Sequence, residues 1–377
     1  MFILKNTIQN YQWGKSEWIS DFLNIKKTNN SPQAELWMGA HPKSPSKTIK
    51  GQSLNSLIDK KGSELLGENT YEKYGRLPFL FKILAVDAPL SIQVHPSKSQ
   101  AEEGFKNENE KSIPLDAHNR NYRDNNHKPE IICAVEPFTA MKGFRSLNII
   151  IEKFSPISKS IKENLFSGGD HASFFFTLMG LSENEKKQIL TEARKIDSKS
   201  LEWMWVKKLM NFYPDDISAL SPLFLNLVEL KKGEALFLPA GELHAYLSGV
   251  GIELMANSDN VLRGGLTPKH MDLEELKKIV NFKHSYVEIL KKGFHDLYPS
   301  RVEEFLLGQK KIIQSYELSL NTSSAILLAF SGTITVTRGK ENHHLKKGET
   351  LFIDSKKENP TLQGTGEVFW ARTGVNP

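Results

Sequence analysis

The sequence predicts a mainly β fold with a helical insert, and three observations support this. Short segments of alternating apolar and polar residues, separated by Gly, Pro, Asn and Asp, are typical of strands in a sandwich or barrel. These segments crowd 77–96 and 130–144, return at 223–262 and appear again at 316–374. KKGEALFL at 231–238 recurs as KKGETLFI at 346–353, which indicates a duplicated β unit. Residues 182–212 show the periodicity of helices instead.

Composition excludes several classes of protein. The chain has 377 residues and a formal net charge of +5, from 49 basic and 44 acidic residues spread along it. This distribution indicates neither nucleic-acid binding nor a membrane-surface patch. The N-terminal apolar run is too short for a signal peptide, and the longest apolar stretch, LPFLFKILAV, is too short for a membrane span. A single cysteine, Cys133, precludes an internal disulfide, so we predict a cytoplasmic protein.

Two adjacent predicted strands carry polar groups suited to chemistry. In SIQVHP, alternation places Ser91, Gln93 and His95 on one face and apolar residues on the other. A solvent-exposed sheet face is the alternative interpretation. In FLFKILAV, Lys82 is the only polar residue. Because a buried unpaired ammonium is costly, Lys82 either extends its charge to solvent or faces an anion.

The next segment, 97–127, is long and polar, with almost no apolar periodicity. Loops of this length are usually lids or mobile segments, so we predict a loop here. NNHKPEIICAV follows and predicts a strand that begins at Glu130. Lys128 shares a face with Glu130 if the strand already starts at Lys128. Taken alone, a carboxylate at a strand entrance is more often an ordinary surface group.

Residues from about 150 to 220 predict the helical insert. Ser182 and Glu185 have the spacing of a capping box at the start of one helix, and a second helix is predicted at 201–212. Further along, Thr267-Pro268 ahead of HMDLEELKKIV predicts another capped helix start.

A third polar cluster lies in the stretch from GEALFLPAGELHAY to RGGLTPKH. The turn PAGE delivers His244 and Tyr246 onto one strand face, and Glu253 lies on the returning strand. Arg263 and Lys269 follow just beyond it. A single histidine after a turn is more often structural than a ligand, so this cluster gains weight only in combination with the others.

Taken together, the clusters bring two imidazoles, a carboxylate and an amide oxygen to one predicted barrel. Mixed N/O ligation of this kind suits zinc, or a related ion such as iron or manganese. The duplicated unit is an internal control, because Asn359 falls opposite His244 and nothing in that unit corresponds to SIQVHP. We therefore predict a metal site in the first unit and none in the second.

Several of these segments are similar to those of a known family. SIQVHP, NHKPE, LPAGELHAY and NSDNVLRGGLTPKH resemble the metal-binding and active-site segments of the type I mannose-6-phosphate isomerases, which are zinc enzymes of the cupin fold. YQWG (Tyr11–Gly14) and AELWMGAHPKSPS (34–46) are also similar to that family, so the resemblance spans most of residues 10–270. From about 285 onward it extends only to general β character.

The resemblance implies two cupin-like (jelly-roll) β domains plus an α-helical domain. A catalytic cupin domain consists of 1–150 and 221–284, divided by a helical insert at 151–220. A C-terminal cupin-like domain at 285–377 carries no metal ligands. We also expect a monomer.

The resemblance further implies one zinc ion per chain. Its ligands correspond to Gln93, His95, Glu130 and His244, and the choice of Gln93 rests on the resemblance alone. Arg263 corresponds to a residue regarded in the family as catalytic. The residues implied to contact the sugar phosphate or to lie close to it are Trp13, Lys82, Ser91, Lys128, Tyr246, Glu253 and Lys269.

The implied reaction interconverts mannose 6-phosphate and fructose 6-phosphate through an enediol and supplies mannose metabolism and GDP-mannose synthesis. A base must move a proton between neighbouring carbons. Glu253, Lys128, His127 and a water held by the metal are all candidates at this point. Two alternatives remain: another cupin metalloenzyme such as an iron-dependent oxygenase, and a sugar-phosphate-binding cupin without catalysis. The expected partner is a small-molecule sugar phosphate.

Overall fold

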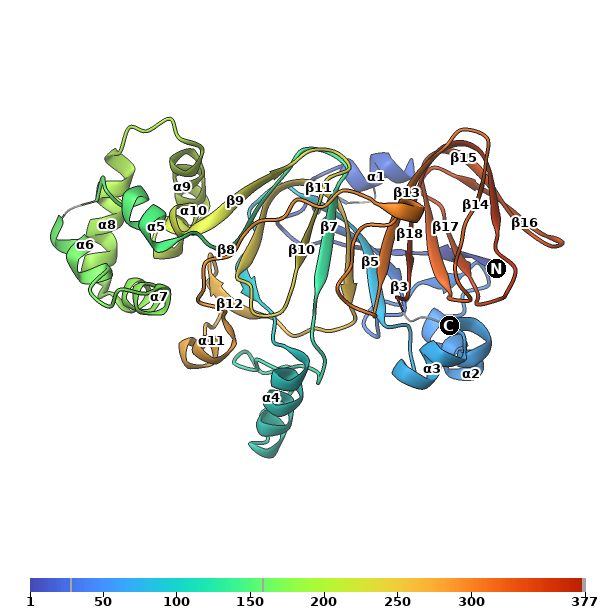
Figure 1. Cartoon of the computed structure of the whole chain (residues 1–377), viewed down its shortest axis with the longest axis horizontal. Coiled ribbons are helices and arrows are strands. Elements are labelled where there is room, and N and C mark those ends of the chain that lie inside the picture. The colour runs from blue at the N-terminus through green and yellow to red at the C-terminus, as the bar shows by residue number, and fades with distance from the viewer. Residues whose placement is uncertain (28, 158, 375–377) are drawn as a thin grey trace.

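Two antiparallel sheets and a helical region make up this computed structural model, in which residues 1–27, 29–157 and 159–374 are described. The larger sheet stands between the helical region and the smaller sheet (Figure 1). The prediction of a mainly β fold with a helical insert is confirmed. In the described part of the chain, no helix has the length and apolar character that crossing a bilayer requires.

The larger sheet contains ten strands among the described residues, organised around one long strand. β11 (His244–Ala256) pairs antiparallel with β5 (Phe79–Val86), β6 (Ile92–Val94), β7 (Glu130–Ala134) and β8 (Phe138–Phe144). The strands that carry Lys82, Gln93 and Glu130 therefore meet at β11. The other strands are β2 (Thr7–Gln9), β3 (Glu35–Gly39), β9 (Leu225–Leu230), β10 (Ala235–Leu238) and β12 (Leu262–Gly265).

The smaller sheet contains eight strands in the described ranges, and it too has a long central strand. β15 (Ala325–Arg338) pairs antiparallel with three neighbours, β16 (Glu341–Lys346), β17 (Thr350–Ile353) and β18 (Thr361–Arg372). The other strands are β1 (Phe2–Lys5), β4 (Lys47–Thr48), β13 (Leu306–Ile312) and β14 (Ser315–Glu317).

The first strand of the chain belongs to this C-terminal sheet. β1 pairs with β17, with Phe2 opposite Phe352, and β4 continues the sheet beyond β1. The predicted range 1–150 therefore contributes strands to both sheets. Pairing satisfies the backbone groups along the edge of β17, but no local pattern signals a partner about 350 residues away. The domain ranges remain a prediction, with β1 and β4 assigned to the smaller sheet.

Helices lie mainly at the end of the larger sheet that is away from the smaller one (Figure 1). Those in the helical region are α5 (Leu147–Lys153), α6 (Lys159–Leu165), α7 (His171–Gly180), α8 (Glu183–Lys195), α9 (Leu201–Phe212), α10 (Ser221–Phe224) and the 3-10 turn η1 (Ile217–Leu220). The others are α1 (Trp18–Leu23), α2 (Leu54–Leu66), α3 (Glu68–Tyr74), α4 (Lys98–Glu110), α11 (Leu273–Ile279) and η2 (Phe294–Asp296).

Two of the helix predictions are confirmed in detail. α8 begins with the capping box predicted at Ser182 and Glu185, in which each side chain bonds the backbone N–H of the other residue. α9 has the bounds predicted for it, 201–212. Ser200 caps this helix by accepting a hydrogen bond from Trp203 N.

Two predictions about helices are wrong. The segment 97–127 was expected to be a loop, yet its first half forms α4. This helix buries Ala101, Gly104 and Glu108, which are small or acidic and leave no apolar period to detect. The helix expected to start at Thr267-Pro268 is α11, which begins later and is capped by Asp272.

The repeated KKGE motif forms the same turn in both sheets. In each copy the glutamate carboxylate accepts a hydrogen bond from the backbone N–H of the first lysine, at 2.9 Å for Glu234 and 2.7 Å for Glu349. Gly233 and Gly348 adopt φ of 83° and 86°, a conformation that favours glycine. The predicted duplication is therefore visible in the backbone conformation of the turn as well as in its amino-acid sequence.

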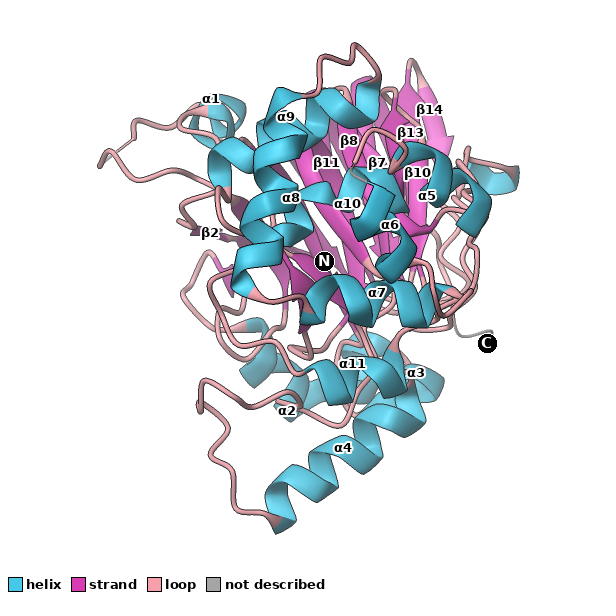
Figure 2. Ribbon diagram, turned by 90° about the vertical axis from the view of Figure 1, so that its left-hand side faces the viewer, coloured by secondary structure: helices cyan, strands magenta, loops and turns pink. Residues whose placement is uncertain are grey.

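The helical region covers one face of the larger sheet (Figure 2). Ile92 and Val94 of β6 pack into its core together with large aromatic side chains such as Phe174 and Phe224. Because side chains alternate along a strand, Gln93 faces the other way. The predicted alternation of SIQVHP is thereby confirmed, and its polar face is directed away from the helical core.

Candidate metal centre and active site

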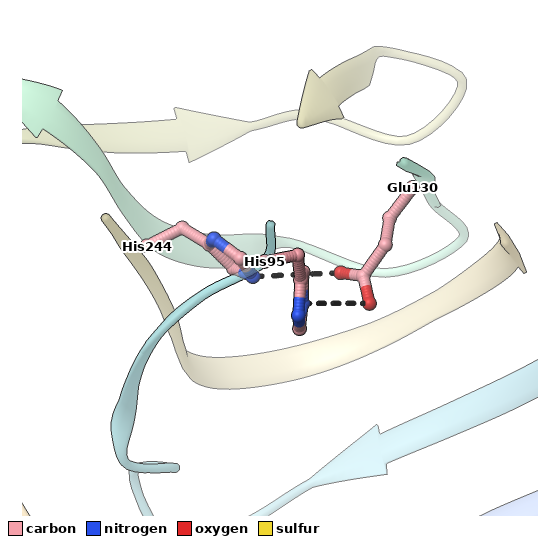
Figure 3. Close-up of side chains that lie close together, drawn as sticks. All are labelled: His95, Glu130 and His244. Atoms are coloured by element: carbon pink, nitrogen blue, oxygen red, sulfur yellow. Dashed lines mark ion pairs between the residues drawn. The ribbon is translucent and has the colours of Figure 1, made fainter. Parts of the chain in front are cut away.

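Three buried side chains from three strand segments converge on one point (Figure 3). His95 directly follows β6, Glu130 opens β7 and His244 opens β11. Glu130 Oε1 lies 3.3 Å from His95 Nε2, and Glu130 Oε2 lies 3.5 Å from His244 Nε2. All three offer a ligand atom within 4.8 Å of the others, which is the arrangement expected of a single-ion site.

The hydrogen bonds of the two histidines prepare both Nε2 atoms to bind a metal. His95 Nδ1 lies 2.7 Å from the carbonyl oxygen of Asn260, and His244 Nδ1 lies 2.8 Å from that of Glu242. A carbonyl only accepts, so each Nδ1 carries the proton and each Nε2 presents a lone pair. His95 Nε2 is buried without a hydrogen-bond partner. Lone pairs and a carboxylate facing one point fit a divalent cation.

The charge of Glu130 is held by its surroundings. Lys128 Nζ lies 2.8 Å from Glu130 Oε1, and the Tyr246 hydroxyl donates a hydrogen bond to Oε2 at 3.2 Å. Burial opposes ionisation, but the charges of Lys128 and His95 hold the pKa of Glu130 well below its usual range. Burial and the charge of Lys128 lower the pKa of His95 to about 4. Near neutral pH the centre therefore combines an ionised carboxylate with a neutral imidazole.

The predicted fourth ligand, Gln93, lies beside the centre. Gln93 is opposite His244 in the β6–β11 pairing and opposite Arg263 in the β6–β12 pairing. It also lines the pocket of about 950 Å³ that opens onto the centre, as do Ser91 and Trp13. Its role as a ligand remains a prediction that this position supports.

A second buried group of charges lies deeper in the sheet. Lys82 Nζ is 2.8 Å from Glu253 Oε2 and 3.8 Å from Glu35 Oε2. Lys82 thus faces an anion, and that anion belongs to the protein. Trp37 donates its indole N–H to Glu35, and the Lys82 ammonium lies over the Trp37 ring, 5.5 Å from its centroid. Burial raises the pKa of Glu253, which the charge of Lys82 partly offsets.

A third group, of three cations, lines the same pocket. Arg263, Lys269 and Arg123 face the pocket, and in the described ranges none has a carboxylate within 4 Å. Burial lowers the pKa of Arg263, and the charge of Arg123 adds to this. The charge of Arg263 is the main cause that lowers the pKa of Lys269. Cations that repel one another, with no carboxylate close by, stabilise an anionic ligand that binds among them.

The structure brings nearly all predicted site residues together. Every one lines the pocket except His95, which is buried against it as part of the metal centre. His127, one of the candidate bases, is the exception among the alternatives. Its Nε2 lies 2.6 Å from Glu304 Oε1, and it is not among the residues that line the pocket. The geometry therefore disfavours His127 as the base.

Four residues with a place in the site were not identified from the sequence. Glu35 and Trp37 share a strand face in AELWMG, and this alternation was the available signal. Arg123 and Asn260 were not nominated, because their hydrogen-bonded neighbours come from separate loops, although Asn260 lies in the quoted segment NSDNVLRGGLTPKH.

The fold and the site together define a class of protein: a two-sheet β metalloenzyme with a buried His, Glu, His centre that opens into a basic pocket. Residues 1–147 match the family model of the type I phosphomannose isomerase catalytic domain. The chain is 39% identical over 381 residues to the mannose-6-phosphate isomerases of Shigella flexneri and of Escherichia coli (strain K12). Each alignment covers 97% of this chain and 97% of the relative. The chain therefore belongs to the type I phosphomannose isomerase family.

Solved structures agree with this assignment. A zinc-bound mannose 6-phosphate isomerase superposes with a TM-score of 0.92 at 36% identity, covering 99% of both chains. The enzyme from Salmonella typhimurium bound to its substrate fructose 6-phosphate and a zinc atom also gives 0.92 at 36% identity, covering 100% of both. At this identity and coverage the likeness extends to the whole fold, including both sheets and the helical region.

Proposed function

We propose that this chain is a zinc-dependent mannose-6-phosphate isomerase, which interconverts mannose 6-phosphate and fructose 6-phosphate in mannose metabolism. One observation carries the proposal: a buried centre of three metal ligands and a group of uncompensated cations face the same pocket. The aldose or ketose end of a sugar phosphate fits the metal centre, and its phosphate fits the group of cations. Full-length relatives with this activity, and their structures with zinc and substrate, support it.

His95, Glu130 and His244 hold the zinc ion, one per chain, and Gln93 is proposed as the fourth ligand. When bound, zinc polarises the sugar oxygens on which negative charge develops. The protein holds this centre rigid, because both imidazoles are fixed by backbone carbonyls and Lys128 neutralises Glu130. Lys128 is therefore proposed as a group that maintains the centre, because its ammonium contacts Glu130.

Arg263 is proposed to stabilise the enediolate. It lies opposite Gln93 in the β6–β12 pairing, and its side chain lines the pocket together with Lys269. Lys269 is the cation proposed to bind the phosphate, which is largely dianionic near neutral pH. Ser91 and Trp13 also line the pocket, and they are proposed to provide a hydrogen-bond donor and an apolar contact for the substrate.

Glu253 is the residue we propose to move the proton from C2 of the aldose to C1 of the ketose. It lines the pocket, and burial raises its pKa toward the range in which a carboxylate works as a base near neutral pH. Lys82 holds its carboxylate in place. The Tyr246 hydroxyl donates a hydrogen bond to Glu130 Oε2 and is proposed to orient that carboxylate.

The proposed activity is tested by incubating the purified protein with mannose 6-phosphate and following fructose 6-phosphate. Turnover that disappears on chelation and returns with zinc is the expected result. No turnover in a folded, zinc-loaded sample refutes the isomerase. Binding of fructose 6-phosphate by that inactive sample then identifies a non-catalytic binding protein.

Replacing Arg263 with alanine is expected to lower kcat/KM by roughly 10- to 150-fold. One charge-assisted contact is worth about 1.5–3 kcal/mol, and 1.36 kcal/mol corresponds to a factor of ten. Arg301→Ala is the matched control, because that exposed arginine pairs with Glu288. Equal rates for both variants exclude a role for Arg263 in the reaction.

The proposal also includes a monomeric state and a cytoplasmic location. The monomer is supported by the family resemblance, and light scattering after size-exclusion chromatography tests it against the chain mass of 42.7 kDa. A cytoplasmic location is supported by the single cysteine, Cys133, which is buried and unpaired.

A further inference from the structure

Arg123 belongs to the third group of pocket cations, but the proposed function gives it no role of its own. It lines the pocket beside Arg263 and Lys269, and its charge acts on both of them. The pocket also has cations whose charge a carboxylate within 4 Å already balances. These pairs are Lys43 with Asp259, Lys82 with Glu253, Arg120 with Glu108, and Lys128 with Glu130.

The backbone of Arg123 is held by one buried side chain. Asn260 is fully buried, and its Oδ1 accepts hydrogen bonds from Arg123 N at 2.7 Å and from Asp124 N at 3.1 Å. Its Nδ2 donates to the carbonyl oxygens of Asp124 at 2.7 Å and Asn126 at 2.9 Å. Both ends of the amide are thus used on a single segment, 123–126, which contains no helix or strand.

The same residue contacts the metal centre through its main chain. The Asn260 carbonyl oxygen is the partner of His95 Nδ1, at 2.7 Å. Asp124 strengthens the connection, because its carboxylate accepts hydrogen bonds from Ser258 Oγ at 2.8 Å and from Asp259 N at 2.7 Å. Asn260 therefore joins the segment that carries Arg123 to the imidazole that faces the metal.

We propose that Arg123 is a further phosphate-binding residue and that Asn260 is the positioning residue that sets its place relative to the metal centre. The inference rests on the proposed function and deepens it. An arginine on an unrestrained segment loses conformational entropy whenever it orders on a ligand, and a fixed backbone removes part of that cost. Asn260 thus helps the pocket to select phosphorylated sugars of a defined length.

The test compares KM, kcat and zinc content for variants of the full chain. Arg123→Ala is expected to raise KM for mannose 6-phosphate by roughly 10- to 150-fold, the range of one charge-assisted contact. The turnover number is expected to stay within about threefold and the zinc content to stay at one per chain. Arg123→Lys keeps the charge and is expected to recover most of the KM.

Asn260→Ala is expected to raise KM in the same way without loss of zinc, because His95 is held by the main chain of Asn260. The double variant Asn260→Ala/Arg123→Ala is expected to resemble Arg123→Ala alone. If the double variant instead raises KM by the product of the two single increases, Asn260 does not act through Arg123. If Asn260→Ala does not fold, Ser258→Ala loosens the same segment by removing the hydrogen bond to Asp124, and a smaller rise in KM is expected.

Asn226→Ala is the matched control for loss of a buried amide. Asn226 Nδ2 lies within 3.1 Å of four carbonyl oxygens around 142–144 and 285, away from Arg123. This variant is expected to be less stable but to keep its KM within twofold. A rise in KM equal to that of Asn260→Ala overturns the positioning role, because a general loss of stability then explains both.

The outcomes separate this inference from the proposed function. If the wild-type protein turns over mannose 6-phosphate and Arg123→Ala keeps the wild-type KM, the inference about Arg123 is overturned and the proposed function stands. A wild-type protein that binds fructose 6-phosphate without turnover refutes the isomerase, and the dissociation constant then replaces KM in every comparison. A zinc-loaded, folded protein that binds neither sugar phosphate overturns both.

Discussion

Replacing His244 with alanine is expected to reduce kcat at least 10³-fold and to bring the zinc content close to zero. His244 is one of the three buried residues that converge on the metal centre, and its Nε2 lies 3.5 Å from Glu130 Oε2. Polarisation by a metal contributes several kcal/mol to the stabilisation of an oxyanion-like transition state, and 1.36 kcal/mol corresponds to a factor of ten. Metal analysis and steady-state kinetics on the same sample measure both effects.

The internal repeat supplies the matched control for this variant. Alignment of the two KKGE turns places Asn359 opposite His244. Asn359 makes hydrogen bonds to Leu320 N and to the Glu317 carboxylate, in the smaller sheet. Asn359→Ala is expected to keep full zinc content and activity. An active, zinc-loaded His244→Ala variant contradicts the assignment of the metal centre.

Replacing Lys82 with methionine is expected to lower the free energy of unfolding by about 3–5 kcal/mol. Methionine has a similar length but no charge, so two buried carboxylates, Glu253 and Glu35, lose their shared cation. Removing one partner of a buried ion pair destabilises a protein far more than the intact pair stabilises it, because the other charge is left buried and unpaired. Denaturation by urea measures the loss, and Lys61→Met, which breaks an exposed pair with Glu64, is the control with an effect below about 1 kcal/mol.

The pH dependence of this loss has a definite sign. Burial already raises the pKa of Glu253, and loss of Lys82 removes the charge that opposes the rise. The folded Lys82→Met variant then binds more protons than its unfolded chain, so its stability increases as the pH falls. The double variant Lys82→Met/Glu253→Gln removes both charges and is expected to recover part of the loss. A Lys82→Met variant as stable as wild type at pH 8 contradicts the buried ion pair.

Much of the fold could be predicted from local patterns. The capping box of α8, the bounds of α9, the KKGE turns and the alternation in SIQVHP all depend on residues within about ten positions of one another. Where the pattern was weak, the prediction was wrong. α4 buries a glutamate that accepts hydrogen bonds from Asn121 N and Tyr122 N, so its buried face carries no apolar signal.

The candidate site divides along the same line. Residue type and spacing were enough to nominate His95, Glu130 and His244, because each stands at a strand end beside a turn. Their meeting at a single point required β6, β7 and β11 to pair in one register. The assignment of Gln93 rested on the family resemblance, and its place beside His244 supports that assignment.

The sequence by itself determined the strand-rich segments at 77–96, 130–144, 223–262 and 316–374, the helical insert, the duplicated turn and the chemical types of the metal ligands, because all of these are encoded over short distances. The tertiary structure decided which charges are partners. Glu253 is paired with Lys82 across 171 residues, Asn260 holds a segment 137 residues away, and β1 completes a sheet formed by the C-terminal third. Such pairs depend on strand register and loop packing, and no local spacing in the chain encodes either.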